Sequence, residues 1–172
     1  MEFYSALILP LVNHGMMQRI NFVIDYAVLS DAKAVHLIEK ECFSTPWSEN
    51  QIIDEIVKEN AIFITAKENG NLCGYISGQL ILDEFYINNI AVSEKYRNNG
   101  IASSLIARLI EILNSKICVL ATLEVRESNY NARKLYERFH FTNLGIRKDF
   151  YSDPKENACI YTLYFNESEC NN

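Results

Sequence analysis

The sequence from Asn89 to Ser103 restricts the architecture of this chain most strongly. An apolar run typical of a strand leads into a short polar connection, and a helical pattern follows directly. Gly100 at the junction permits left-handed backbone angles and a close approach of the backbone to a ligand. The helix N-terminus after it presents unpaired N–H groups and the positive end of the helix dipole, which suit a phosphate group. The segment predicts a strand, a tight turn and an anion-binding helix start, with an ordinary strand-to-helix turn as the alternative.

Chain length and net charge limit the remaining possibilities. The 172 residues are enough for one domain with a substantial core, which we expect over residues 21–166, between an N-terminal extension (1–20) and a polar tail (167–172). The formal net charge of −6 argues against general nucleic-acid binding and is compatible with a cationic acceptor such as an amine. The apolar run near the N-terminus is too short to span a bilayer. We expect a cytoplasmic monomer that binds neither nucleic acid nor a membrane.

The cysteines and histidines show no metal-binding spacing. The five cysteines include no C-x-x-C pair, and the three histidines are far apart in the sequence. An odd number of cysteines scattered through apolar segments is typical of reduced thiols in a cytoplasmic protein. We therefore expect free thiols and no metal site.

Hydrophobic periodicity predicts seven strands and four helices in a mixed α/β (α+β) arrangement. The order is one strand, two helices, three strands, a helix, a strand, a helix and two strands. Strands are expected at 22–29, 61–66, 72–82, 85–92, 117–125, 141–151 and 158–165. Helices are expected to begin at Ser30, Ser48, Gly100 and Asn129.

Short local signals support these elements. Ser30 is a candidate N-cap, and Ser48 with Gln51 forms a capping box. Asn69-Gly70 is a strong hairpin signal between two strands. The first two helices are expected to bury the apolar side chains of Val35, Leu37, Ile38, Cys42, Ile52, Ile53, Ile56 and Val57.

A second informative block begins at Glu124, which lies near the end of an otherwise apolar strand. Partial burial there is expected to raise the pKa of its carboxyl group toward that of a useful general base. Asn129 and Tyr136 are seven positions apart on the next helix, so they share a face. Each residue also has a structural interpretation: Glu124 as an ion-paired or solvated side chain near Arg126, Tyr136 as core packing and Asn129 as a helix cap.

Together these motifs resemble the GNAT superfamily of acetyl-CoA-dependent N-acetyltransferases. Arg97-x-x-Gly100-x-Ala102 matches its pyrophosphate loop, [Q/R]-x-x-G-x-[G/A]. Over roughly residues 23–163, the chain resembles the RimI subfamily in particular. The segments that carry this finer likeness are Pro46-Trp47-Ser48, Asn89-Ile90-Ala91-Val92, Leu123-Glu124-Val125-Arg126, Ser128-Asn129 and Leu135-Tyr136-Glu137.

The resemblance implies a fold and a co-substrate. The fold is a mostly antiparallel central sheet of about seven strands, splayed between the fourth and fifth and flanked by four helices. The co-substrate is acetyl-CoA, without a metal. The residues implied to bind it are Ile90, Ala91, Val92, Arg97, Asn98, Asn99, Gly100, Ile101, Ala102, Ser103 and Asn129.

The resemblance also implies roles in catalysis. Glu124 matches the family's general base and Tyr136 its general acid, while Trp47, Arg147 and Tyr151 lie in segments that border the acceptor. RimI enzymes acetylate the N-terminal alanine of a small-subunit ribosomal protein, by direct attack of the amine in a ternary complex. The chain departs from the family pattern at two positions. His140 precedes Phe141 where the family usually has glycine, and we expect it to take the left-handed conformation. Phe150 stands where the family often has tyrosine.

The chemistry of amines favours an N-terminal acceptor. An α-amino group has a pKa of about 7.7–8.0 and a lysine about 10.4, so deprotonation at pH 7 costs about 1 and about 4–5 kcal/mol respectively. One carboxylate base is sufficient for the first case. A backbone N–H of the strand that ends at Val92 is expected to stabilise the oxyanion. Acetylation of another protein N-terminus or of a small amine stays open, as does a non-catalytic acyl-CoA-binding module.

Overall fold

Residues 21–165, the part of the chain that the computed structural model describes, contain one seven-stranded sheet in the order β1-β2-β3-β4-β5-β7-β6. All neighbouring strands are antiparallel except β4 and β5. The extension at 1–20 and the tail at 167–172 lie outside the described residues. The strands are β1 (Val23–Tyr26), β2 (Ala61–Glu68), β3 (Asn71–Ile81), β4 (Glu84–Val92), β5 (Leu120–Arg126), β6 (Thr142–Ser152) and β7 (Lys155–Tyr164).

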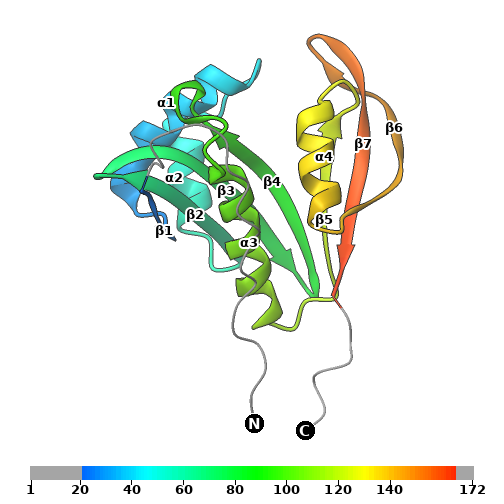
Figure 1. The fold of residues 1–172 in the computed structure, drawn as a ribbon, viewed down its shortest axis with the longest axis horizontal. Coiled ribbons are helices and arrows are strands. Elements are labelled where there is room, and N and C mark those ends of the chain that lie inside the picture. Colours follow the sequence, from blue (N-terminus) through cyan, green and yellow to red (C-terminus); the bar gives the residue numbers. More distant parts are fainter. Residues whose placement is uncertain (1–20, 166–172) are drawn as a thin grey trace, which may run out of the picture.

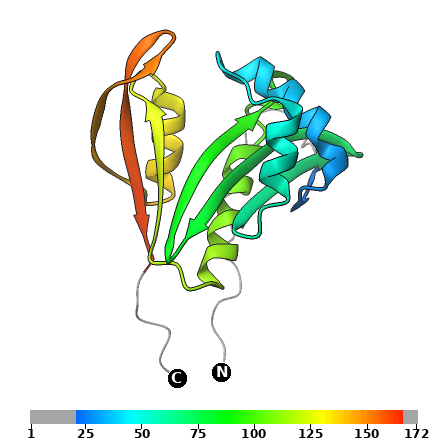
Figure 2. The same cartoon turned by 180° about the vertical axis from the view of Figure 1, so that it is seen from behind.

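Helices cover both faces of the sheet (Figure 1 and Figure 2). One hydrophobic cluster joins α1 and α2 to the first face, and another joins α3 and α4 to the opposite face. The predicted mixed α/β architecture, with its order of elements, is thus confirmed. The helices are α1 (Ala32–Cys42), α2 (Glu49–Ile56), α3 (Ile101–Asn114) and α4 (Tyr130–Arg138), with short 3-10 turns at Leu29–Asp31 and Glu94–Tyr96.

The sheet is splayed between β4 and β5, as the family resemblance implies. The two strands pair in parallel only where Glu84–Tyr86 lies beside Leu120–Thr122. Beyond that point β5 stays paired with β7 as far as Arg126, while β4 diverges from it. The gap between the two halves of the sheet is visible in Figure 1 and Figure 2. Among the strands of residues 21–165, none pairs with this edge of β4 along its second half.

Three local sequence signals are confirmed in detail. Asn69 and Gly70 both have positive φ angles, 49° and 81°, which is the geometry of a type I′ hairpin turn. The Ser48 side chain accepts a hydrogen bond from the Gln51 backbone N–H, and the Gln51 side chain accepts one from the Ser48 N–H. His140 has a φ of 64°, so it adopts the expected left-handed conformation after α4.

The first strand and first helix differ from the prediction. The strand ends at Tyr26, and Ser30 lies inside a 3-10 turn instead of capping the helix. The N-cap of α1 is Asp31, whose carboxylate accepts a hydrogen bond from the Val28 N–H at 3.0 Å and pairs with Lys67. The Asp31 side chain makes no capping hydrogen bond to α1, because its carboxylate is used by the Val28 N–H and Lys67. Two side chains expected to be buried, Leu37 and Val57, are 54% and 60% exposed.

A β-bulge in β4 changes which residues face each helix layer. Two consecutive residues of β3, Gly78 and Ser77, pair with Ile87 and Asn89 of β4. Asn88 is therefore an extra residue in β4. A Cβ atom at Gly78 would lie 2.3 Å from the Tyr86 carbonyl oxygen, so only glycine fits there.

The extra residue shifts the alternation of the strand by one position. Before the bulge, Phe85 and Ile87 pack in the cluster of α3; after it, Ile90 and Val92 do so. Asn88 and Asn89 consequently face the same side, toward α1 and α2.

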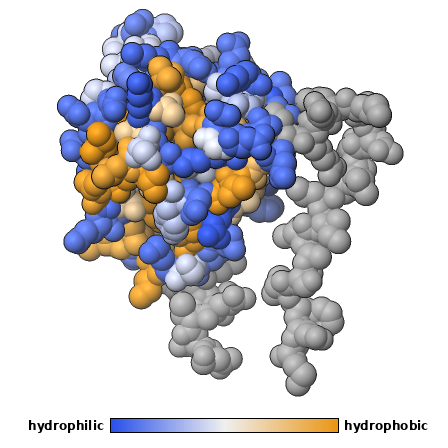
Figure 3. Space-filling view, turned by 90° about the vertical axis from the view of Figure 1, so that its left-hand side faces the viewer, coloured by the Kyte–Doolittle hydropathy of each residue, from blue (hydrophilic) through white to orange (hydrophobic). Residues whose placement is uncertain are grey.

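The surface around β1 and α1 mixes hydrophilic areas with separate apolar patches (Figure 3). Exposed apolar residues in this part of the sequence include Val23, Val28 and Leu29. Every helix within residues 21–165 is too short or too polar to cross a membrane.

Candidate active site

A cleft with a volume of about 1890 Å³ runs along the splay between the two halves of the sheet. Its walls come from the α1–α2 loop, β4, the β4–α3 turn, β5, α4 and the β6–β7 hairpin. Most of the residues singled out from the sequence line it, namely Trp47, Ile90, Ala91, Val92, Arg97, Asn98, Gly100, Ile101, Ala102, Ser103, Glu124, Asn129, Tyr136 and Tyr151. Asn99 and Arg147 are not among the lining residues.

The edge of β4 turns backbone polar groups into this cleft. The Ser93 N–H donates to the Cys73 carbonyl of β3 at 2.9 Å. Because backbone groups alternate along a strand, those of Ala91 also point toward β3, and those of Ile90 and Val92 point the other way. On that side β5 has already diverged, so the N–H groups of Ile90 and Val92 are available to a ligand.

The β4–α3 turn is held by its own backbone and one amide. Asn98 and Gly100 have φ angles of 64° and 79°, which explains the requirement for glycine at the helix N-cap. The Asn99 amide donates to the carbonyls of Tyr96 and Arg97 at 3.1 and 2.9 Å. The Asn99 side chain therefore stabilises the turn from behind instead of lining the cleft.

The start of α3 has the features of an anion site. The Gly100 carbonyl accepts the first helical hydrogen bond, from the Ser104 N–H at 3.0 Å, so the N–H groups of residues 101–103 precede the helical ladder. The first turn contains no acidic residue. The Arg97 guanidinium lies close by, donating to the Val92 carbonyl at 3.2 Å. Free N–H groups, a helix dipole and a cation thus converge at one end of the cleft, and these features fit a diphosphate.

Glu124 lies across the cleft on β5, on the more open side of the sheet, and is only partly covered. Its side chain is 38% exposed and pairs with Arg147 at 3.3 Å. The neighbours Leu123 and Val125 pack toward α4 on the opposite face of the strand. Helices α1 and α2 cover the other half of the sheet, so the Glu124 face of β5 is left open. Arg126, the partner considered from the sequence, pairs with Glu156 instead.

Tyr136 lies in α4 at the opposite wall and is only 4% exposed. Its ring packs against Phe141 and Tyr161, with centroids 5.9 and 6.1 Å apart. Burial raises the pKa of Tyr136 well above its usual range, so the phenol keeps its proton at neutral and mildly basic pH. The core-packing interpretation and a role at the cleft are therefore both compatible with its position.

Asn129 is the N-cap of α4. Its side-chain oxygen accepts a hydrogen bond from the Ala132 N–H at 3.2 Å, which confirms the capping interpretation. Because Asn129 also lines the cleft, its amide NH₂ group can contact a ligand there. Capping and ligand binding use different atoms of the same side chain.

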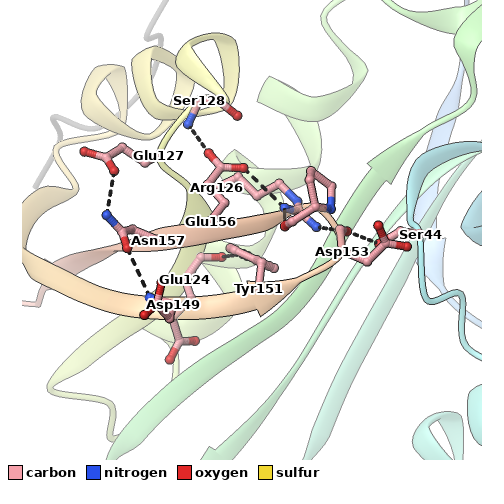
Figure 4. A network of polar contacts seen from close by, with 11 residues as sticks. Ser44, Glu124, Arg126, Glu127, Ser128, Asp149, Tyr151, Asp153, Glu156 and Asn157 are labelled. Carbon is pink, nitrogen blue, oxygen red and sulfur yellow. Dashed lines mark hydrogen bonds and ion pairs between the residues drawn. The ribbon is translucent and has the colours of Figure 1, made fainter.

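The α1–α2 loop, which holds Trp47, meets the β6–β7 hairpin across the cleft. The Ser44 hydroxyl donates to the Asp153 carbonyl at 2.8 Å, and the Arg126 guanidinium donates to the same carbonyl at 2.7 Å (Figure 4). Arg126 also lies 4.2 Å over the ring of Tyr151, whose hydroxyl donates to the Glu124 carbonyl at 3.3 Å. Two segments distant in the sequence thus form one continuous wall beside Glu124.

Two buried carboxylates near the cleft were missed from the sequence. Glu39 of α1 is 0% exposed and Glu55 of α2 is 3% exposed. Helical periodicity did contain a signal, because Glu39 falls in the inward stripe with Val35 and Ile38. In residues 21–165, no group of three or more His, Cys, Asp or Glu side chains is arranged to hold a metal ion.

Comparison with known proteins agrees with this geometry. Residues 32–141 match the Acetyltransferase (GNAT) family. The chain is 32% identical over 136 residues to the ribosomal protein bS18-alanine N-acetyltransferase of Escherichia coli (78% of this chain, 91% of the relative). It is 34% identical over 137 residues to that of Haemophilus influenzae (78% and 92%).

A solved structure gives the same result at the level of the fold. The crystal structure of the ribosomal-protein-S18-alanine N-acetyltransferase from Escherichia coli superimposes with a TM-score of 0.81 at 30% identity, covering 88% of this chain and 99% of that one. The splayed sheet, the glycine-containing turn at the start of α3 and these similarities lead to one conclusion. The chain belongs to the GNAT family of acetyl-CoA-dependent N-acetyltransferases.

Proposed function

We propose that this enzyme acetylates the N-terminal amine of a protein, specifically the N-terminal alanine of a small-subunit ribosomal protein. The observation that carries the proposal is the likeness to the Escherichia coli and Haemophilus influenzae enzymes over 91% and 92% of their lengths. An exposed carboxylate at the open wall of the cleft is consistent with a protein acceptor. A cytoplasmic monomer that binds no nucleic acid is part of the same proposal.

Acetyl-CoA supplies the acetyl group as an activated thioester. In this proposal the backbone of Ile90, Ala91 and Val92 binds the pantetheine arm along the free edge of β4. The diphosphate is bound at the α3 start, and the Asn129 amide contacts the cofactor from the far wall. The residues assigned to the diphosphate are Arg97, Asn98, Gly100, Ile101, Ala102 and Ser103, and Asn99 belongs to the same turn, which its side chain holds from behind.

Glu124 takes the proton that the acceptor amine loses, directly or through a water molecule. In the absence of acceptor its carboxylate pairs with Arg147, so the incoming ammonium group takes the place of the guanidinium. Tyr136 gives its phenolic proton to the departing thiolate. Trp47, Arg147 and Tyr151 border the acceptor. A single carboxylate base favours an α-amino group over a lysine as acceptor, because the lysine costs more to deprotonate at neutral pH.

The cofactor assignment predicts a charge effect at the helix start. Ala102→Glu places a carboxylate where the diphosphate is expected, so we expect the Kd for acetyl-CoA to rise about tenfold or more, equivalent to about 1.4 kcal/mol. Isothermal titration calorimetry measures this directly. Ala107→Glu, an exposed position further along α3, is the matched control and should bind normally. Equal affinities of the two variants would contradict the diphosphate site.

A panel of acceptors tests the proposed function. A peptide beginning Ala-Arg-Tyr should be acetylated with a kcat/KM about tenfold or more above that of lysine peptides with a blocked N-terminus. Release of CoA and the mass of the peptide are the measurements. The same peptide with its N-terminus already acetylated should not react. Equal or faster reaction of free polyamines would show that the ribosomal assignment is wrong.

A further inference from the structure

Two buried carboxylates hold consecutive asparagines of β4 in place. Glu39 Oε1 accepts a hydrogen bond from Asn89 Nδ2 at 2.7 Å. Glu55 Oε1 accepts one from Asn88 Nδ2 at 2.9 Å. Because these asparagines are neighbours, a regular strand would place them on opposite faces. The bulge places both on the α1 and α2 side, where each helix supplies one carboxylate.

Glu39 also links this strand to the acceptor wall. Its Oε2 accepts a hydrogen bond from the Trp47 backbone N–H at 2.8 Å, and Oε1 accepts a second one from the Tyr75 hydroxyl. Burial, together with the Glu39 charge, raises the pKa of Tyr75, so the hydroxyl stays a donor. One carboxylate therefore joins α1, β3, β4 and the α1–α2 loop.

Asn88 and Asn89, which the two carboxylates hold, directly precede the β4 backbone groups that face the cleft. Asn89 precedes Ile90, whose N–H points into the gap between β4 and β5. A bulged strand with one free edge has fewer constraints than a fully paired strand. Pairing with β3 sets the side to which the Ile90 N–H points, and the side-chain contact of Asn89 holds the adjoining strand segment in place. Burying the Glu39 carboxylate costs desolvation energy, and an apolar side chain would fill the same space without that cost.

We propose that Glu39 is a positioning residue for acetyl transfer: it holds Asn89, and through it the Ile90 N–H, in line with the acetyl carbonyl, and it fixes the Trp47 loop to the same strand. The inference rests on the proposed function for its acceptor only. Glu39 touches neither substrate, and its effect reaches the reaction through Asn89 and Trp47.

A double-mutant cycle tests this role. Glu39→Gln and Asn89→Ala should each lower kcat about tenfold or more at saturating acetyl-CoA and peptide, with a smaller change in the Kd for acetyl-CoA. The double variant should be no slower than the slower single variant, because both changes weaken the same link between Glu39 and Asn89. Tyr75→Phe is the control, since it removes one contact of Glu39 but leaves the bond to Asn89. Its thermal stability should fall, while its kcat should stay close to the wild-type value.

Hydrolysis of acetyl-CoA separates this inference from the proposed function. In that reaction the oxygen of water bonds to the acetyl carbon, the C–S bond breaks, and acetate and CoA thiol form. It needs the same polarised carbonyl but no peptide. If the wild type does not acetylate the alanine peptide, the proposed acceptor is wrong. The double-mutant cycle is then measured with the rate of acetyl-CoA hydrolysis. Folded Glu39→Gln and Asn89→Ala variants with wild-type rates, or independent effects of the two changes, would overturn the positioning role.

Discussion

Glu124→Gln is expected to lower kcat for peptide acetylation by about 10²-fold or more, the usual effect of losing a general base. Glutamine has the same shape but cannot accept the proton that the amine must lose. The Kd for acetyl-CoA should not change, because the anion-binding turn lies at the other end of the cleft. Steady-state kinetics with the alanine peptide, together with calorimetry for acetyl-CoA, measure both quantities.

Glu127→Gln is the matched control for this prediction. Glu127 lies three residues further along the chain, and its carboxylate accepts a hydrogen bond from Asn157 Nδ2 at 3.0 Å, away from Arg147. The control should keep nearly full activity. A folded Glu124→Gln enzyme with wild-type kcat would show that another group, or the solvent, removes the proton.

Tyr136→Phe is expected to lower kcat by about 10²-fold while the protein stays folded. Phenylalanine keeps the ring that packs against Phe141 and Tyr161 and removes only the hydroxyl group. Without that proton donor, the thiolate must leave unprotonated. Tyr130→Phe is the control, because it makes the same substitution in the same helix at a position that is 65% exposed.

The pH dependence adds a second measurement for Tyr136. Burial raises its pKa, so the phenol stays protonated from neutral to mildly basic pH. The ratio of wild-type to Tyr136→Phe rates should therefore stay constant from about pH 7 to about pH 10, where an ordinary tyrosine is half ionised. A ratio that fell steeply across that range would indicate that the phenol ionises there, and would contradict its role as the acid.

Most elements of the fold could be predicted because their signals are local. The Asn69-Gly70 turn, the Ser48 capping box and the left-handed His140 depend on backbone preferences of the residues themselves. Ser30 shows where such reasoning fails. The helix starts after Asp31 instead, and the ion pair of Asp31 with Lys67 on β2 has no signal in the local sequence.

The candidate site divides in the same way. The turn from Arg97 to Ala102 is a continuous motif, so its backbone geometry followed from its residues. The environment of Glu124 did not, because α1 and α2 cover only the other half of the sheet and leave its face of β5 open. Its partner Arg147 comes from β6, which reaches Glu124 across β7.

The sequence by itself determined the order of elements, the tight turn before α3 and the family, since each depends on residues close together in the chain. Only the tertiary structure decided how these parts meet. The divergence of β4 from β5 frees the N–H groups of Ile90 and Val92. The bulge turns Asn88 and Asn89 toward the same layer. The physical reason is that exposure, ion pairing and strand alignment depend on packing between distant segments, which local preferences do not specify.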